Sequence, residues 1–399
     1  MRILVINSGC LKVNCSANLC HIAYIQGFVE NGCDVTVVSK SGRGLTLDSS
    51  LKLPEGPRYI EIDGSIMSSI VGGRAREAVV AVSKDKSNYL KQMRGWIIQL
   101  VIKTIYGELG VSQAWVNNLC KKFKDKIPYD LIVSLSGPVT SHMACVELIK
   151  KRNVTGHFFC ELWEDPWQLD LFNDSVDSRK KKLEEETVCK ADKVLYVSPI
   201  TLDNQRKFLP KGKNKMDWVP LPYYYKQEKI ESFESLTYGY YGDYFPNSRN
   251  ILPFYEAAKR LNAKVHICGN PVNLIYSKDN IDVHPRVTIE ELKKYENDTN
   301  VLVLVCNLRG GQIPGKIYQY AATKKKILFI LDGATKEKQV LREYFEKFNR
   351  FHFCENEVED ICRAMKDLQS NNDISNEPLE FFSPKNITSE IIRKCVQSD

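Results

Sequence analysis

Carboxylates and tryptophans gather in one short stretch of this sequence, CELWEDPW at residues 160–167, directly after a buried-strand pattern. Aromatic faces bind sugar rings, and carboxylates accept hydrogen bonds from hydroxyls or act as general bases. The stretch therefore predicts a site for a hydroxyl-rich molecule, with Glu161, Glu164 or Asp165 as the reacting or orienting group. The alternative is an Asp-Pro turn with its tryptophans packed in the core.

A glycine-rich turn, GGQIPGKIYQY at residues 310–320, follows another buried-strand pattern and introduces a helix. Glycines allow a diphosphate to approach the backbone, and free N–H groups at a helix start attract anions. Lys316 adds a formal charge in the first turn. We expect a diphosphate to bind here; the alternative is an ordinary strand-to-helix turn with a solvated lysine.

Arg249 forms a third candidate, in the stretch YYGDYFPNSRN at residues 240–250. It follows an expected strand and precedes an expected helix. A planar guanidinium can bind two phosphate oxygens at once. This pattern predicts a phosphate contact, with a plain surface arginine as the alternative.

Other nucleotide and metal signatures are missing from the sequence. The turn at Ser8 and Gly9 lacks the second glycine of GxGxxG, and the second strand pattern ends at Ser39 instead of an acidic residue. The P-loop pattern fails because Ile317 follows Lys316. The 13 cysteines include no CxxC pair, so we expect no metal site and free, buried thiols in a reducing compartment.

Length and composition favour a globular, cytoplasmic protein. The 399 residues suffice for two to three domains, and 43% hydrophobic with 26% charged residues excludes a largely disordered chain. No apolar run approaches the roughly 20 residues that span a bilayer, and the opening run does not predict a signal peptide.

The net charge of +7 is concentrated between residues 74 and 126, a segment with eleven basic and four acidic residues. The same segment carries an apolar stripe from Trp96 to Tyr106. It predicts a basic helical insertion that contacts an anionic membrane surface, peripheral to the inner face of the cell membrane, or a phosphorylated acceptor. A solvated face around a core helix is the alternative. Nucleic acid is not expected, because no recognition motif accompanies the charge.

Strand and helix patterns alternate along the chain, which predicts an α/β protein with parallel sheets. A cluster of proline and aromatic residues at 219–225 predicts a hinge between two doubly wound, Rossmann-like domains. We expect an N-terminal acceptor-side domain at 1–222 with the insertion at about 74–126. A nucleotide-sugar-binding domain follows at 223–380, and a C-terminal helix at 381–399 returns to the first domain.

Six stretches occur in the order found in a known family: ILVINSG, DLIVSLSGPVTSH, ELWEDPW, CKADKVLYVSP, YGYYGDY…RN and GQIPGKIYQYAATKKKIL. The chain resembles the family-four-type glycosyltransferases of the GT-B fold, in particular the bacterial capsule and exopolysaccharide type with an Asp-Pro-Trp element. The resemblance covers most of the chain outside 74–126. It implies two doubly wound domains facing each other across a cleft.

The resemblance also implies a reaction and a site. A sugar would move from a nucleotide diphosphate sugar to a glycan or lipid-linked acceptor in surface polysaccharide synthesis, with retention and without a metal or cofactor. Asp165 would be catalytic, with an acceptor side formed by Glu161, Glu164, Trp167, Ser8 and Gly9. The donor side would comprise Gly242, Asp243, Arg249, Gln312, Gly315, Lys316 and Gln319.

The chain departs from this family at one place. Many members carry two glutamates eight positions apart, and Gly311 and Gln319 stand at these positions here. Gln319 can hydrogen-bond ribose hydroxyls but supplies no carboxylate. Two other functions therefore stay open: a GT-B nucleotide-sugar epimerase, which needs no acceptor, and a non-catalytic GT-B protein that binds a partner transferase or a membrane.

Overall fold

The computed structural model describes residues 1–64, 112–171, 173, 175–227, 235–270, 275–309, 311–370 and 376–396. Most of the expected basic insertion, including its apolar stripe, lies outside the described residues. The chain forms two compact units. The first contains Met1–Val197, Gln205–Val219 and the residues from Ile387 onward, and the second contains Ser198–Asn204 and Pro220–Asn386.

The first unit is built on a seven-stranded parallel sheet with the strand order β3-β2-β1-β4-β5-β6-β7. Its central strands are buried on both faces and are therefore almost continuously apolar. The strands are β1 (Arg2–Asn7), β2 (Asp34–Lys40), β3 (Arg58–Ile62), β4 (Leu131–Leu135), β5 (Phe159–Trp163), β6 (Lys193–Tyr196) and β7 (Met216–Trp218).

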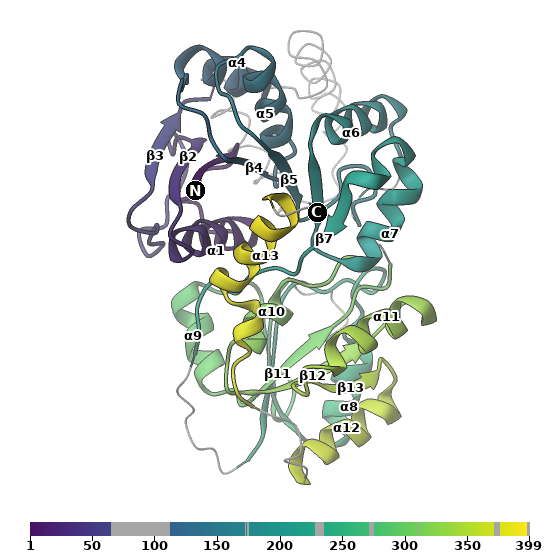
Figure 1. Cartoon of the computed structure of the whole chain (residues 1–399). Helices are drawn as coiled ribbons and strands as arrows, with labels where there is room; N and C mark the ends of the chain where they lie inside the picture. Colours follow the sequence, from purple (N-terminus) through teal and green to yellow (C-terminus); the bar gives the residue numbers. More distant parts are fainter. Residues whose placement is uncertain are drawn as a thin grey trace, which may run out of the picture. The chain divides into compact units, whose positions relative to one another are not determined.

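Helices cover both faces of this sheet (Figure 1). One layer holds α4 (Ser112–Lys122), α5 (Thr140–Lys150) and α6 (Ser178–Lys190). The other holds α1 (Ser16–Glu30) and α13 (Pro384–Val396), which are joined by a 2.9 Å hydrogen bond from Asn31 Nδ2 to Thr388 Oγ1. Because α1 leaves β1 toward one face and α5 leaves β4 toward the other, the carboxyl ends of β1 and β4 form the switch point where such sheets bind ligands.

The remaining elements of this part of the chain connect β6 to β7. They are α7 (Pro199–Phe208) and a 3₁₀ helix, η2 (Pro210–Lys215). Residues 198–204, which include the first part of α7, belong to the second unit, and residues 205–219 belong to the first.

The second unit has a six-stranded parallel sheet with the order β10-β9-β8-β11-β12-β13. Its strands are β8 (Thr237–Tyr241), β9 (Lys264–Cys268), β10 (Ile281–His284), β11 (Val301–Val305), β12 (Lys326–Leu331) and β13 (His352–Glu355). Its helices are α8 (Leu252–Arg260), α9 (Ile289–Asn297), α10 (Lys316–Ala321), α11 (Thr335–Glu346) and α12 (Val358–Ser370), with a short 3₁₀ turn, η3 (Glu380–Phe382).

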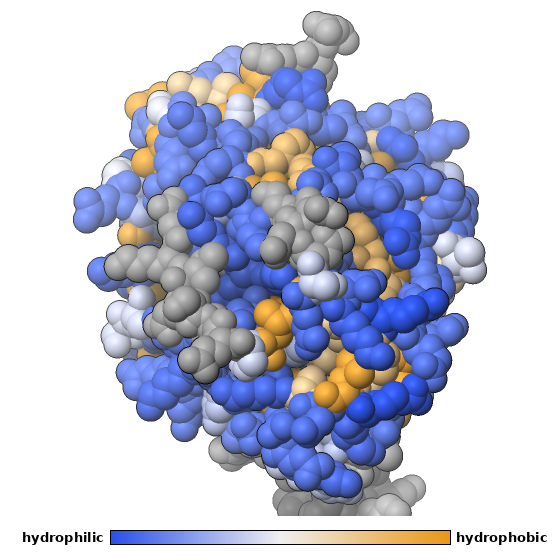
Figure 2. Space-filling view, turned by 90° about the horizontal axis from the view of Figure 1, so that it is seen from below, coloured by the Kyte–Doolittle hydropathy of each residue, from blue (hydrophilic) through white to orange (hydrophobic). Residues whose placement is uncertain are grey.

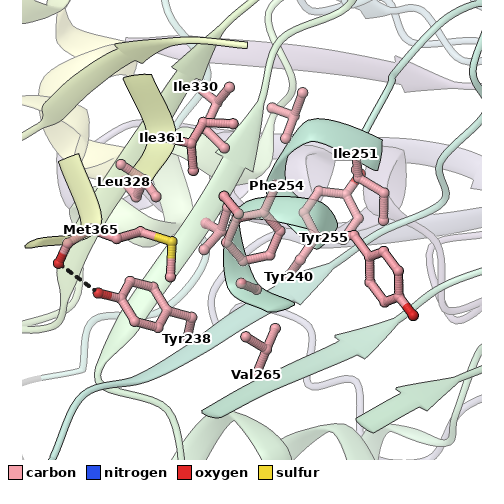
Figure 3. Packing of buried hydrophobic residues seen from close by; sticks show 14 of the residues in the cluster. Tyr238, Tyr240, Ile251, Phe254, Tyr255, Val265, Leu328, Ile330, Ile361 and Met365 are labelled. Carbon is pink, nitrogen blue, oxygen red and sulfur yellow. Dashed lines mark hydrogen bonds between the residues drawn. The ribbon is translucent and has the colours of Figure 1, made fainter. Parts of the chain in front are cut away.

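One face of this sheet packs against α8 and α12, and Figure 3 shows the resulting core. Tyr238 and Tyr240 alternate with residues of the opposite face along β8 and lie among Phe254, Ile361 and Met365. The one polar atom of Tyr238 is satisfied, because its hydroxyl donates a 3.1 Å hydrogen bond to the Met365 carbonyl. This packing fixes β8, whose carboxyl end carries the candidate donor residues.

The surface has no exceptional apolar region on the side shown in Figure 2, where hydrophobic residues occur in small separate areas. Scattered exposed apolar side chains are normal in soluble proteins. In the described residues, no helix is long and apolar enough to cross a membrane. All 13 cysteines are free, and the described side chains include no group of three or more potential metal ligands.

Candidate functional site

The turn after β1 is fixed by hydrogen bonds at the switch point of the first sheet. The amide of Ser8 donates to Ser141 Oγ at 2.9 Å, and the two serine hydroxyls are 3.0 Å apart. Gly9 donates its amide to Asn7 Oδ1 at 2.9 Å. A side chain at residue 9 would meet Asn7 Oδ1 at 3.2 Å, so the close turn favours glycine. Ser8 is buried, and its hydroxyl serves the turn.

Glu164 lies at the same edge, at the end of β5. Its amide donates to Ser136 Oγ at 2.7 Å, and its Oε1 is 3.1 Å from Nε2 of His21. The His21 ring is fully buried and also contacts the Ser136 carbonyl at 2.9 Å. His21 therefore orients a predicted acceptor-side carboxylate. The sequence analysis missed it, because one histidine on the buried face of a helix also fits an ordinary core residue.

Asp165 is exposed in the loop that follows, and Trp167 is half-buried. The backbone of this loop is held from the interior of the unit. The amides of Trp167 and Gln168 donate to the two carboxylate oxygens of Glu184 at 3.2 and 3.1 Å. Glu184 also escaped sequence analysis, since it lies on α6 in a charged run that resembles a solvated helix face.

Glu161 departs from the expectation of an acceptor-binding residue. Its side chain is fully buried and accepts a 3.0 Å hydrogen bond from Trp163 Nε1. Burial raises the pKa of Glu161 to about 8, despite the opposing effect of the Trp163 hydrogen bond. The reason is the pleat of β5, which places Glu161 and Trp163 on the same face of a strand that is buried throughout. The Glu161 side chain thus belongs to the interior of the unit.

In the second unit, Arg249 is locked onto the turn after β11. Its Nε and Nη2 donate to Asn307 Oδ1 at 3.0 and 2.7 Å, while Nη1 points to the Asp243 carbonyl at 3.4 Å. Asn307 in turn donates through Nδ2 to the Gln312 carbonyl at 3.1 Å. The guanidinium is therefore preorganised between the ends of two neighbouring strands, β8 and β11.

Asp243 holds a second cation, Arg286, at the end of β8. Its carboxylate accepts hydrogen bonds from Arg286 and from the Asn270 amide, each 2.9 Å long at Oδ1. Burial alone would raise the pKa of Asp243, but the Arg286 and Asn270 hydrogen bonds outweigh it and hold the pKa below its usual value. Asp243 is therefore an anion that positions Arg286, which sequence analysis did not select.

Gly242 lies where the ends of β8 and β9 approach each other closely. The Gly242 amide donates to the Cys268 carbonyl at 2.9 Å. A Cβ at Gly269 would lie 1.9 Å from the Gly242 carbonyl oxygen, so a side chain there forces the two strand ends apart.

Lys316 completes a group of three cations around residues 241–243. Its Nζ donates to the Tyr241 carbonyl. Desolvation by the surrounding protein lowers the pKa of Lys316 to about 8, against the raising effect of Glu296, although part of the side chain remains accessible. Gly315, exposed, begins the six-residue helix α10 that places the lysine.

Gly311 and Gln319, which stand where many members of the resembled family carry glutamates, have structural tasks here. Gln319 Oε1 accepts the Tyr224 amide at 3.1 Å, and its Nε2 donates to the Tyr225 carbonyl at 2.8 Å. Gly311 has a φ of +70°, and a Cβ there would meet Ile200 Cγ2 at 2.4 Å. Its carbonyl accepts a 2.6 Å hydrogen bond from Ser198 Oγ. Gln319 thus holds the backbone at residues 224–225.

Comparisons with known proteins identify the fold. Neither a family model nor a curated protein sequence matches this chain. Among solved structures, the catalytic domain of starch synthase IV from Arabidopsis thaliana, bound to ADP and acarbose, is similar with a TM-score of 0.65. The two share 8% sequence identity, and the match covers 98% of each chain.

Two further structures agree. Sucrose-phosphate synthase from Thermosynechococcus elongatus gives a TM-score of 0.57 at 10% identity, covering 97% of this chain and 94% of that one. The UDP-GlcNAc 2-epimerase from Methanocaldococcus jannaschii gives 0.50 at 10% identity, covering 98% and 99%. This chain therefore has the α/β fold called GT-B, as the sequence analysis predicted.

Proposed function

We propose that this protein is a glycosyltransferase that moves a sugar from a nucleotide diphosphate sugar to a glycan or lipid-linked acceptor. The observation that carries the proposal is the group of Arg249, Arg286 and Lys316 around the carboxyl end of β8. Preorganised cations stabilise negative charge that develops on a departing group. A nucleoside diphosphate is such a leaving group, and carboxyl ends of parallel strands are where this type of sheet binds ligands.

The chemistry follows from these charges. The bond from the anomeric carbon to the diphosphate oxygen breaks, and its electron pair remains on the diphosphate near Arg249 and Lys316. The acceptor oxygen forms the new bond and loses its proton to a base. We propose Asp165 as the carboxylate that takes up the proton or orients the hydroxyl, with Glu164 and Trp167 beside it in the same loop.

We further propose that the protein's own cations carry this charge without a metal cofactor, and that the configuration at the anomeric carbon is retained. Arg249 supports the first point, since its guanidinium is already fixed by two bonds to Asn307. The order of the six sequence stretches supports retention and a family-four-type transferase of surface polysaccharide synthesis.

Turnover of nucleotide sugars tests the proposal. Incubation with a panel of nucleotide sugars should release a nucleoside diphosphate from one donor, faster when glycan or polyprenyl-phosphate-linked sugars are added as acceptors. Arg260→Gln, which removes an exposed arginine of α8 that pairs with Glu359 of α12, is the control for Arg249→Gln. Equal release from both variants would contradict the role of Arg249.

An epimerase is the second candidate, favoured by the structural similarity to the archaeal UDP-GlcNAc 2-epimerase. An epimerase would interconvert two nucleotide sugars with no acceptor and would release no free nucleoside diphosphate in step with product. Chromatography of the nucleotide sugars from the same incubation separates the two reactions. A non-catalytic protein would bind its partner and give neither product.

We also propose that the first unit contacts an anionic membrane surface. Exposed lysines at 121 and 122 end α4 and those at 124 and 126 follow it, while the exposed basic residues 150–152 begin at the last residue of α5. Asn153 ties these ends together, because its Nδ2 donates to the carbonyls of Cys120 and Phe123. Ile127, 62% exposed, lies beside the lysines.

Each basic residue near an anionic membrane contributes about 1 kcal/mol of attraction. Flotation with phosphatidylglycerol vesicles should therefore carry the protein upward, while pure phosphatidylcholine vesicles should not. Replacing the lysines at 121, 122, 124 and 126 by glutamine should weaken flotation. Binding that is equal on both vesicle types, or absent from both, would contradict this proposal.

A further inference from the structure

The loop that carries Asp165 and Trp167 rests on one buried carboxylate. Glu184 projects from α6 into the first unit with no exposed surface. Its Oε1 accepts the Trp167 amide at 3.2 Å and Gln205 Nε2 at 3.1 Å, and its Oε2 accepts the Gln168 amide at 3.1 Å. Both carboxylate oxygens are thus committed to donors.

The far side of the loop is fixed independently of Glu184. The Gln168 side chain accepts the Asp177 amide at 2.9 Å, and Asn173 Nδ2 donates to the Trp167 carbonyl at 2.6 Å. Asp177 caps α6 by accepting the amides of Arg179 and Lys180. Loss of a Glu184 contact would therefore free the amide side of residues 167–168, while the Trp167 carbonyl stays held by Asn173.

The electrostatic environment of Glu184 makes its hold on the loop dependent on pH. Burial raises the pKa of Glu184 to about 7, more than its three hydrogen bonds lower it. Glu161 on β5 and Tyr196 on β6 are the titratable groups that interact with it from the sheet, and α7 contributes the neutral Gln205. Lys215, in η2, acts on Glu161.

We propose that Glu184 is a positioning residue, whose ionised carboxylate holds the loop bearing Asp165 and Trp167 ready for the acceptor and whose protonation loosens that loop. A carboxylate accepts at both oxygens, whereas a carboxylic acid turns one oxygen into a donor. A proton on Oε2 would place a second donor against the Gln168 amide N–H, which donates to that oxygen in the structure. The assignment of this loop to the acceptor site rests on the proposed function, whereas its loosening on protonation of Glu184 does not.

Protonation of Glu184 should stabilise the fold but loosen the loop. This difference distinguishes a positioning role of Glu184 from a purely structural one. Since the pKa of Glu184 is raised on folding, its contribution to the free energy of unfolding grows as pH falls through about 7 toward the unfolded value of about 4.5. A purely structural carboxylate would leave the loop firmer at low pH. The positioning role predicts a looser loop over the same range.

Fluorine NMR of the full-length protein labelled with 5-fluorotryptophan measures this directly and needs no substrate. Trp167→Phe assigns the Trp167 signal among the five tryptophans. In the wild-type protein this signal should shift in one step centred near pH 7 and broaden on the acidic side. In Glu184→Gln, an isosteric change that also leaves one donor facing the loop, the step should vanish and the acidic position should persist at all pH values.

Glu185→Gln is the matched control, because Glu185 is the next residue on α6 and pairs with Lys211 at 3.0 Å outside the loop. It should keep the step. A step that persists in Glu184→Gln, or a wild-type Trp167 signal that does not change between about pH 5.5 and about pH 9, would overturn the proposal. Once an acceptor is known, Glu184→Gln should raise the KM for acceptor several-fold and leave the KM for donor unchanged. An absence of transferase activity with the titration intact would refute only the function.

Discussion

Three cations contact Tyr241 and Asp243 at the end of β8, and each is held in a different way. Asn307 fixes Arg249, the carboxylate of Asp243 fixes Arg286, and Lys316 reaches the Tyr241 carbonyl from α10. Two of the three were predicted from sequence, because an arginine or lysine after a glycine-containing turn is visible locally. Arg286 was not, since its partner Asp243 lies 43 residues away. His21 was missed because it also fits an ordinary core histidine, and Glu184 because its charged run resembles a solvated helix face.

At the residue scale, Lys316 predicts a pH dependence of nucleotide binding. Its pKa of about 8 means that the free protein loses this positive charge as pH rises, whereas a bound diphosphate retains the proton. The affinity for a nucleoside diphosphate should therefore be constant at neutral pH and fall as pH rises from about 8 toward about 10. Isothermal titration calorimetry over this range checks the trend.

Lys316→Arg is the control for this titration, because a guanidinium stays charged throughout the range. Its affinity should change little above pH 8. A wild-type affinity that is the same at pH 7 and pH 10 would show that Lys316 does not contact the phosphates.

Asp165 predicts a separate effect on turnover. Asp165→Asn keeps the shape of the exposed loop but removes the charge that accepts or orients a proton, so the rate of transfer should fall by roughly 10²–10⁴-fold. Donor affinity should be unchanged. The control is Asp34→Asn, an exposed carboxylate at the opposite edge of the same sheet. Full activity of Asp165→Asn would assign the catalytic role elsewhere, with Glu164 the next carboxylate to test.

At the scale of elements, the long apolar strands and their following helices were predictable, because period and length identify them together. The edge strands β3, β7, β10 and β13 were not, since they are short and mix polar with apolar residues. Edge strands are half-exposed, so their sequences carry no continuous apolar run. Glu161 shows a related limit: the pleat, not the motif, decided that its side chain faces the interior.

The contact between the ends of β8 and β9 yields a stability prediction. Gly269→Ala would place a methyl group 1.9 Å from the Gly242 carbonyl oxygen, and this oxygen belongs to backbone that the sheet holds. Overpacking of this kind costs about 1–3 kcal/mol of unfolding free energy, measured by urea denaturation. Gly242→Ala is the matched control, because its added Cβ meets nothing closer than 3.7 Å. Equal stability of both variants would contradict the close approach.

At the scale of the whole molecule, the alternation of strands and helices correctly predicted two parallel-sheet units and the GT-B fold. The pattern predicted that the C-terminal helix returns to the first domain, and in the structure the residues from Ile387 belong to the first unit. It gave no sign that residues 198–204 belong to the second unit. Such placements depend on packing partners such as Gly311 and Thr388, which are remote in sequence. The charged ligand implied for the second unit is the central claim about the molecule.

A thermal-shift screen of the full-length protein against nucleoside diphosphates and their sugars, with and without magnesium, tests that claim most directly. A ligand at about a hundred times its Kd adds about 2.7 kcal/mol to the stability of the state that binds it. We predict a higher Tm with one nucleoside diphosphate and its sugars, equal with and without magnesium, and a smaller shift in Arg249→Gln. No shift with any nucleotide, or the same shift in Arg249→Gln as in the wild type, would contradict it.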